Sequence, residues 1–254
     1  MRSIALISLL TLLASSQAAG QIVNVLPVAR NGGDGASAVL TLAADRRTGA
    51  TDLLLVSGGV RLTRRSGATL ALAIVEGEVG DRGGDRFAAH HFQHVRYRAR
   101  LSKWLHAEAF AQHEANRFRR LGLRVLAGAG LRAERALGDS GTLAVGSAYM
   151  PERERLREGA ESDAGQTSGH HRWSSYASVQ WAPSDGVTLS HTTFMQPRLD
   201  VFGDWRALSE TAITSPLGAR ASVRLSLTLT HDSRPPEGVT QTDTRTKTAV
   251  GLRF

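Results

Sequence analysis

Arginine is the residue type with which this sequence could do most chemistry. The chain carries 31 lysines and arginines against 23 aspartates and glutamates, a formal charge of +8, and its only lysines are Lys103 and Lys247. Guanidinium groups bind carboxylates and phosphates through paired hydrogen bonds. Arg96, Arg98 and Arg100 stand at every second position, which on an extended strand places them on one face about 6–7 Å apart. They predict either an anion-attracting surface or one side of an ion-pair network.

Two interpretations of this basic face stay open. Glu108 falls on the next segment with the same parity, so it is the nearest carboxylate in the sequence for Arg96 or Arg98, and buried charges must be paired. An internal ion-pair network would use such carboxylates, whereas an anion-preferring pore would leave the arginines in excess. The predicted basic cluster is Arg61, Arg96, Arg98, Arg100, Arg124 and Arg224, with Glu108, Glu210 and Asp45 as candidate internal partners.

Histidine and serine offer weaker chemistry. The pairs His90-His91 and His170-His171 fall in predicted loops, and neighbours on a strand would point to opposite faces and chelate a metal poorly. For the same reason Ser190 with His191, or His231 with Asp232, cannot act as a hydrogen-bonded nucleophile and base. His106 shares a face with Glu108 without an evident nucleophile. The chain has no cysteine, which excludes disulfides and thiolate zinc sites. We predict no catalytic, metal or cofactor site.

Two charged segments could serve as loops. Arg153, Arg155 and Arg157 alternate with glutamates, which is typical of a solvated loop or of a strand that continues beyond a membrane, where lipopolysaccharide phosphate could bind. Farther along the chain, Asp232, Glu237 and Asp243 could hold a divalent ion, although their spacing is not that of a dedicated calcium loop.

The arginines are positioned by a repeating two-residue pattern. Leu54, Val56, Val60 and Leu62 share one face while Arg61 lies on the other, and the odd-numbered residues from Leu121 to Leu131 oppose Arg124 in the same way. Similar alternation covers 95–101, 221–230 and 247–254. The apolar faces carry no charge. A guanidinium facing lipid at mid-bilayer costs about 2–4 kcal/mol, so in a membrane barrel the arginines must point inward.

The whole pattern contains about twelve segments of this kind. Most run about 10–12 residues, which is longer than soluble strands and close to the length of tilted membrane strands. Short turns alternate with longer loops at 78–89, 151–171 and 232–242, as in outer-membrane barrels. We predict an all-β transmembrane antiparallel up-and-down barrel with strands at 37–46, 53–64, 69–77, 90–101, 104–114, 119–135, 142–150, 172–182, 187–197, 204–214, 219–231 and 243–254.

Two features of the pattern leave alternatives. The segment from Trp104 to Gln112 is rich in helix formers, but as a strand it would present Ala107, Ala109 and Ala111 to lipid, and the neighbouring pattern favours the strand. Gly122, Gly128 and Gly130 lie on the inner face. Their missing side chains would leave the room that a pore needs.

The amino terminus indicates export. Arg2 precedes an apolar run from Ile4 to Ala14 and then small residues up to Gly20, the pattern of a cleaved signal peptide. We divide the chain into a signal peptide at 1–20, a periplasmic lead-in at 21–35 and the barrel at 36–254. Export argues against nucleic acid as the partner, although a pI near 11.0 would otherwise raise that possibility.

Several motifs resemble a known family. These are the segments 101–112, 116–118 and 123–130, the run His231-Asp232-Ser233-Arg234-Pro235-Pro236-Glu237-Gly238-Val239, and a last strand whose face is Val250, Leu252 and Phe254. They resemble the salt-induced outer-membrane protein family of proteobacteria, a family of unknown function. The resemblance implies a barrel in the bacterial outer membrane, in contact with lipid and lipopolysaccharide, whose terminal strand is the signal for the outer-membrane assembly machinery. It implies no activity, so we expect a structural or envelope-stress barrel or a narrow pore, and not an enzyme.

Overall fold

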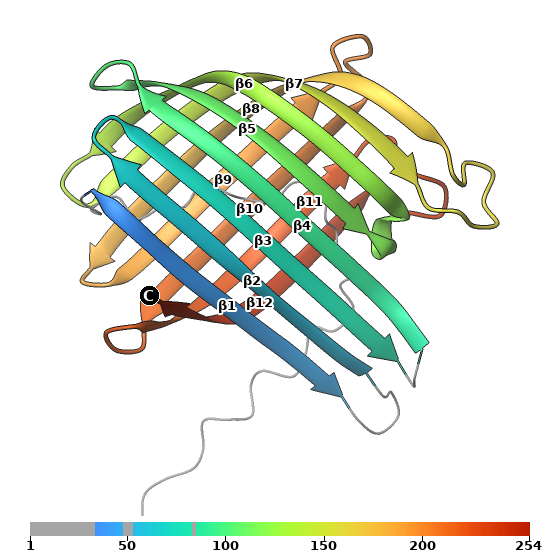
Figure 1. Cartoon of the computed structure of the whole chain (residues 1–254), viewed down its shortest axis with the longest axis horizontal. Coiled ribbons are helices and arrows are strands. Elements are labelled where there is room, and N and C mark those ends of the chain that lie inside the picture. Colours follow the sequence, from blue (N-terminus) through green and yellow to red (C-terminus); the bar gives the residue numbers. More distant parts are fainter. Residues whose placement is uncertain (1–33, 48–52, 83–84) are drawn as a thin grey trace, which may run out of the picture.

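The chain forms a closed antiparallel β-barrel (Figure 1). The computed structural model describes residues 34–47, 53–82 and 85–254, so the predicted signal peptide and almost all of the lead-in lie outside the described residues. Every strand pairs with its neighbours in sequence, and the last strand returns to the first. The strands are β1 (Gly35–Arg47), β2 (Leu53–Ser66), β3 (Thr69–Arg82), β4 (Asp85–Arg100), β5 (Leu105–Asn116), β6 (Leu121–Leu137), β7 (Gly141–Leu156), β8 (Thr167–Ser184), β9 (Val187–Pro197), β10 (Trp205–Pro216), β11 (Ala221–Asp232) and β12 (Thr242–Arg253), with a short 3-10 helix, η1 (Arg117–Arg119), between β5 and β6.

The predicted fold class and all twelve predicted strands are confirmed. The ambiguous segment is the strand β5, not a helix, and Ala109 and Ala111 are exposed on the outer face of the barrel. The helix propensity of these residues is overridden because the segment pairs with β4 on one edge and β6 on the other. Ala109, for example, lies beside Tyr97 of β4 and Ala129 of β6. Pairing on both edges decides the structure where local propensity is weak.

Two of the three predicted long loops are wrong. The strands β3 and β4 continue through almost all of 78–89, and β7 and β8 leave only 157–166 of the second loop. The predicted loop at 232–242 is confirmed as 233–241. The pairs His90-His91 and His170-His171 therefore lie in β4 and β8 instead of in loops. Of the two alternatives for the charged segment around Arg153 and Arg155, the strand that continues is confirmed: Glu152 and Glu154 are buried and Arg153 and Arg155 exposed.

The barrel has two distinct ends. One end, which we call the turn end, carries the short connections 67–68, 101–104, 138–140, 185–186 and 217–220, together with Gly35 and the carboxyl terminus (Figure 1). The other, the loop end, carries η1 and the connections 157–166, 198–204 and 233–241. Trp104 and Trp181 are exposed at the turn end, and Trp173 lies exposed toward the loop end. Such tryptophans are typical of the two edges of a membrane.

The outer face is apolar. Leu62, Val95, Leu131 and Leu227 are among the large hydrophobic side chains that point outward. Leu121 is an exception to the predicted face, since it is buried, and the pairing register of β6 shifts between Leu121 and Leu123. A bulge at the start of the strand reverses the parity there. In the described part of the chain no helix is long and apolar enough to cross a membrane.

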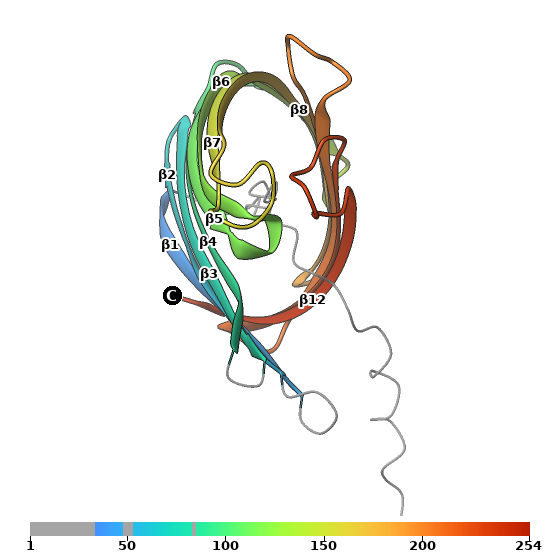
Figure 2. The ribbon, with the colours of Figure 1, turned by 90° about the vertical axis from the view of Figure 1, so that its right-hand side faces the viewer.

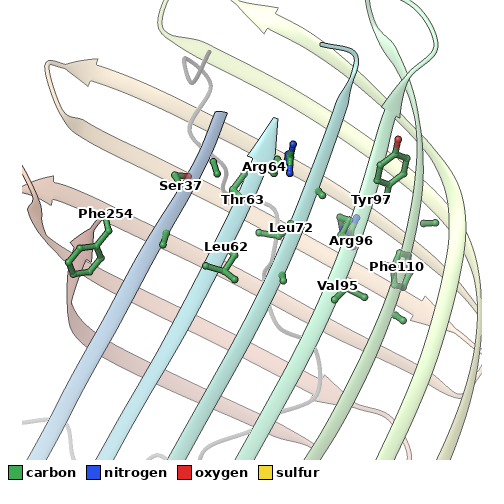
Figure 3. Close-up of a pocket in the computed structure, with 16 residues that line it drawn as sticks. Ser37, Leu62, Thr63, Arg64, Leu72, Val95, Arg96, Tyr97, Phe110 and Phe254 are labelled. Carbon is green, nitrogen blue, oxygen red and sulfur yellow. The ribbon is translucent and has the colours of Figure 1, made fainter. Parts of the chain in front are cut away.

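Small residues make a groove of about 860 Å³ on this outer face (Figure 3). Ala71 and Ala73 on β3 lie between Leu62 on β2 and Val95 and Tyr97 on β4, with which they are in register. Large and small side chains therefore alternate from strand to strand around this side of the barrel.

Two of the inward-facing glycines lie against other groups of the barrel. The ring of Phe110 lies where a Cβ of Gly128 would be, and the backbone at Ser147 and Ala148 occupies that place at Gly130. At Gly128 and Gly130 the space is therefore taken by these groups, and not by arginines or by an opening. The two glycines let large inner side chains and neighbouring backbone approach the wall, which only glycine permits.

The seam between the first and last strands is the shortest pairing in the barrel. Four residue pairs, from Val39–Arg253 to Leu42–Val250, join β1 to β12, compared with thirteen pairs between β1 and β2. The backbone of Phe254 extends this seam, with its N–H donating to Ala38 O at 3.0 Å and its carbonyl accepting from Ala38 N at 3.2 Å.

We predict that deleting Phe254 reduces barrel assembly more than deleting residues 21–30. The first deletion removes two hydrogen bonds from a short seam, and the second lies outside the strands that the structure describes. The measurement is the fraction of purified protein that shifts on unheated gels, as closed barrels do. Equal folded fractions for the two deletions would contradict this role of the terminal residue.

Candidate functional site

The interior of the barrel contains two buried groups of ion pairs. We call them the Glu108 cluster (Arg96, Arg98, Glu108, Arg132 and Tyr176) and the Glu154 cluster (Arg124, Glu152, Glu154, Arg172 and Arg206). All members point inward because their strands alternate, and the outer parity of the same strands is apolar or exposed.

The Glu108 cluster joins two of the predicted arginines to the predicted carboxylate. Glu108 accepts from Arg96 Nη1 at 2.9 Å and from Arg98 Nε at 2.8 Å. Tyr176, three strands away on β8, donates from its hydroxyl to the same carboxylate at 2.7 Å and accepts from Arg132 at 3.1 Å. The Arg96 guanidinium also lies 4.8 Å from the centre of the Phe110 ring, a distance at which cation–π attraction operates.

The Glu154 cluster lies closer to the loop end. Arg206 on β10 donates to both oxygens of Glu154, at 2.6 and 2.9 Å, and Arg124 Nε donates to Glu154 at 2.5 Å. Arg172 donates to Glu152 at 2.6 Å and is 1% exposed. Paired guanidinium and carboxylate groups of this kind form the strongest hydrogen bonds between side chains.

Both clusters cross the lumen. Tyr176 on β8 reaches Glu108 on β5, and Arg206 on β10 reaches Glu154 on β7. On the opposite side, Arg245 on β12 pairs with Glu78 on β3. Each contact joins strands three positions apart in the closed sheet, so the side chains bridge parts of the wall that are not adjacent.

The other predicted site residues lie at different heights along the lumen. Arg224 pairs with Glu210 at 2.6 Å in a half-exposed position. Arg61 faces inward on β2, and Arg100 is exposed at the turn end. The side chain of Asp45, a predicted partner, lies outside the described residues. The structure thus joins Arg96 and Arg98 to Glu108, and Arg224 to Glu210, but brings no single cluster of six arginines together.

Several residues of the Glu154 cluster were absent from the sequence-based prediction. Arg172 and Arg206 lie inside the predicted strands 172–182 and 204–214, but the sequence-based prediction did not include them in the inward-facing cluster. The signal that could have found them is the Glu152–Glu154 alternation, which continues the inner face of β7 toward the loop end.

The loop end carries η1 and a set of contacts between loops. Arg119 of η1 is buried and donates to Asp243 on β12 at 3.1 Å, across the barrel from β5 and β6. Arg120, which has a positive φ of 54°, donates to Asp163 at 2.6 Å and to the carbonyl of Glu237 at 2.8 Å. In Figure 2, the loop after β7 and the loop after β11 meet over the opening.

We call the contacts among Arg120, Glu161, Ser162, Asp163 and Glu237 the loop clasp. The backbone N–H of Glu237 donates to Asp163 at 2.9 Å, and the Ser162 hydroxyl donates to Glu237 at 2.5 Å. The hydrogen bond from the Glu237 backbone, with help from Arg120, lowers the pKa of Asp163. Hydrogen bonds from Ser162 lower the pKa of Glu237. Both carboxylates are therefore held in their charged form.

The catalytic and metal candidates are not assembled into sites. Ser190 is buried and His191 exposed, and Asp232 pairs with Arg206 while His231 contacts Thr242. Among the described residues no group of three or more potential ligands could hold a metal ion. The three acidic residues predicted near the last loop contact Arg119, Arg206 and Ser162 instead of one another.

We predict that Glu108→Ala destabilises the barrel by about 3–5 kcal/mol, because it leaves two buried guanidinium groups without their carboxylate. Glu210→Ala is the matched control. It removes the partner of one half-exposed arginine, so it should cost about 1 kcal/mol or less. The measurement is urea unfolding of the purified barrel in lipid vesicles, and similar losses for the two variants would contradict the cross-lumen role of Glu108.

Solved structures of other barrels have a fold similar to that of this chain. Among solved structures, the NanC porin shares 9% identity with a TM-score of 0.53, and the match covers 87% of this chain and 99% of that one. The translocator domain of the autotransporter NalP from Neisseria meningitidis shares 14% identity with a TM-score of 0.51, over 89% and 90% of the two chains. Identities this low establish the fold alone.

Sequence comparison is more specific about the family. No curated protein matches the chain. The model of the family described as "Protein of unknown function, DUF481" matches residues 40–254, which include eleven complete strands and most of β1. The chain therefore belongs to this family of unknown function.

Proposed function

We propose that the protein is a non-enzymatic barrel of the bacterial outer membrane whose lumen is closed at rest. The turn end faces the periplasm and the loop end faces the outside, after export by the predicted signal peptide. Its role is structural within the envelope, and the resemblance to salt-induced proteins connects that role with salt stress.

The observation that carries this proposal is the set of ion pairs across the lumen. Arg206 is held by Glu154 from three strands away, and Glu108 by Tyr176 over the same separation. Opening a passage would require separating these charges, and removing one partner of a buried pair costs about 3–5 kcal/mol. At the loop end, η1 and the loop clasp add a second closure.

The outer surface supports placement in the membrane with defined contacts. The apolar belt suits lipid tails. Arg153 and Arg155 point outward at the loop end of β7, where lipopolysaccharide phosphates would meet them. The terminal strand with Val250, Leu252 and Phe254 would be the segment that the assembly machinery recognises.

A narrow anion-preferring pore is the second candidate. The observation in its favour is the excess of arginine inside the turn end, where Arg65, Arg98, Arg100 and Arg132 surround one carboxylate, Glu134. A lumen with this charge would favour anions if it opened.

We predict that the purified barrel gives little or no conductance in planar bilayers at neutral pH, and that Arg206→Ala increases it by loosening the Glu154 cluster. Any current should be anion-selective, measured as a reversal potential in a potassium chloride gradient. A large steady conductance of the unmodified protein would reject the closed barrel and favour the pore. Clear cation selectivity would contradict both candidates.

We also predict that acid releases the loop clasp. Because the pKa values of Asp163 and Glu237 are lowered in the folded protein, the clasp is fully stable above about pH 5 and weakens as the pH falls through the lowered values. The expected result is faster proteolysis of the loop 157–166 in acid, measured with an acid-active protease. Asp163→Asn should produce the same sensitivity at neutral pH.

The control is Asp200→Asn. Hydrogen bonds from Arg198 lower the pKa of Asp200 to about 2, but this pair lies in the loop after β9 and does not contact the clasp. If Asp200→Asn exposes the loop 157–166 as much as Asp163→Asn, the clasp is not what holds that loop.

A further inference from the structure

A polar pocket of about 130 Å³ lies inside the barrel at the turn end. The inward-facing ends of strands from β2 to β8 line it, and its charged residues are Arg65, Arg98, Arg100, Arg132 and Glu134. The pocket lies on the turn-end side of the Glu108 cluster, and Arg98 and Arg132 belong to both. Those contacts close its inner end, so a ligand would enter from the compartment that the turn end faces.

The charge of the pocket is unbalanced. It contains four arginines and one carboxylate, and that carboxylate is held by Arg132 at 3.0 Å. Arg98 donates to Glu108 through Nε, and the Arg100 side chain makes no ion pair with any residue that the structure describes. A concave site with excess charge of one sign concentrates ions of the opposite sign.

Two buried polar atoms in the same pocket point to a ligand independently of charge. His106 Nδ1 and Thr142 Oγ1 have no hydrogen-bond partner within the described ranges. A buried polar atom without a hydrogen-bond partner destabilises the folded protein. An imidazole N–H and a hydroxyl can both donate, so a ligand rich in acceptor oxygens would satisfy them together with the guanidinium groups.

The size of the pocket limits the ligand. One water occupies about 30 Å³ in the liquid, so the space matches about four oxygen-sized groups. Guanidinium forks bind tetrahedral oxyanions through paired hydrogen bonds. We propose that this pocket binds a phosphate-class oxyanion, either inorganic phosphate or the phosphate group of a small phosphomonoester. The proposal does not depend on whether the lumen conducts, because the pocket opens on one side of the closure.

The test is calorimetric titration of the full barrel in uncharged detergent, at low ionic strength because salt screens such binding. The probes are inorganic phosphate and glycerol 3-phosphate. We expect millimolar or tighter binding of phosphate, weakened about tenfold by Arg100→Gln, which corresponds to about 1.4 kcal/mol. Glu134→Gln should instead tighten binding, because it removes the one negative charge of the pocket.

The matched control is Arg64→Gln, which removes the same charge from the same end of β2 but on the exposed outer face. Gel mobility without heating verifies that each variant is folded. Binding of both probes supports a phosphomonoester ligand, and binding of inorganic phosphate alone supports the free ion. The proposal is overturned if phosphate does not bind the unmodified barrel, or if Arg64→Gln weakens binding as much as Arg100→Gln.

Discussion

The structure depends on one constraint, which is that a guanidinium group can face neither lipid nor an empty interior. A charge at mid-bilayer on the outer face costs about 2–4 kcal/mol, so the alternating arginines turn inward. Once inside they require carboxylates, and Glu108 and Glu154 each hold two of them. The apolar belt outside and the ion-pair clusters inside are therefore two consequences of the same strand alternation.

The shape of the barrel follows from filling its interior. The ring of Phe110 occupies the place where a Cβ of Gly128 would lie, and the ring of Tyr176 occupies the same place at Gly146. The Tyr176 hydroxyl can then reach Glu108 and connect β8 with β5. Close packing against the wall and charge pairing between separated strands thus support each other, and the interior is lined by polar and charged groups.

The likeness to porins concerns the architecture alone, because one fold carries many functions. The role of the interior must therefore be argued from the residues that line it. In this chain the ion pairs lie toward the middle and the loop end, and the arginine excess lies at the turn end. This division separates the two functional questions. Closure concerns the Glu108 and Glu154 clusters with the loop clasp, and ligand binding concerns the pocket around Arg100.

The sequence by itself determined the strand count, the closed antiparallel class and the face on which most residues lie, because a strand has a side-chain period of two that can be counted along the chain. It also found Glu108 beside Arg96 and Arg98, since adjacent strands bring nearby residues together. Only the tertiary structure decided that Arg206 meets Glu154, that Arg119 meets Asp243 and that Gly128 is filled by Phe110. Those contacts depend on how far each strand extends, where bulges shift the register and how the closed sheet curves, and none of these quantities is encoded in a local pattern.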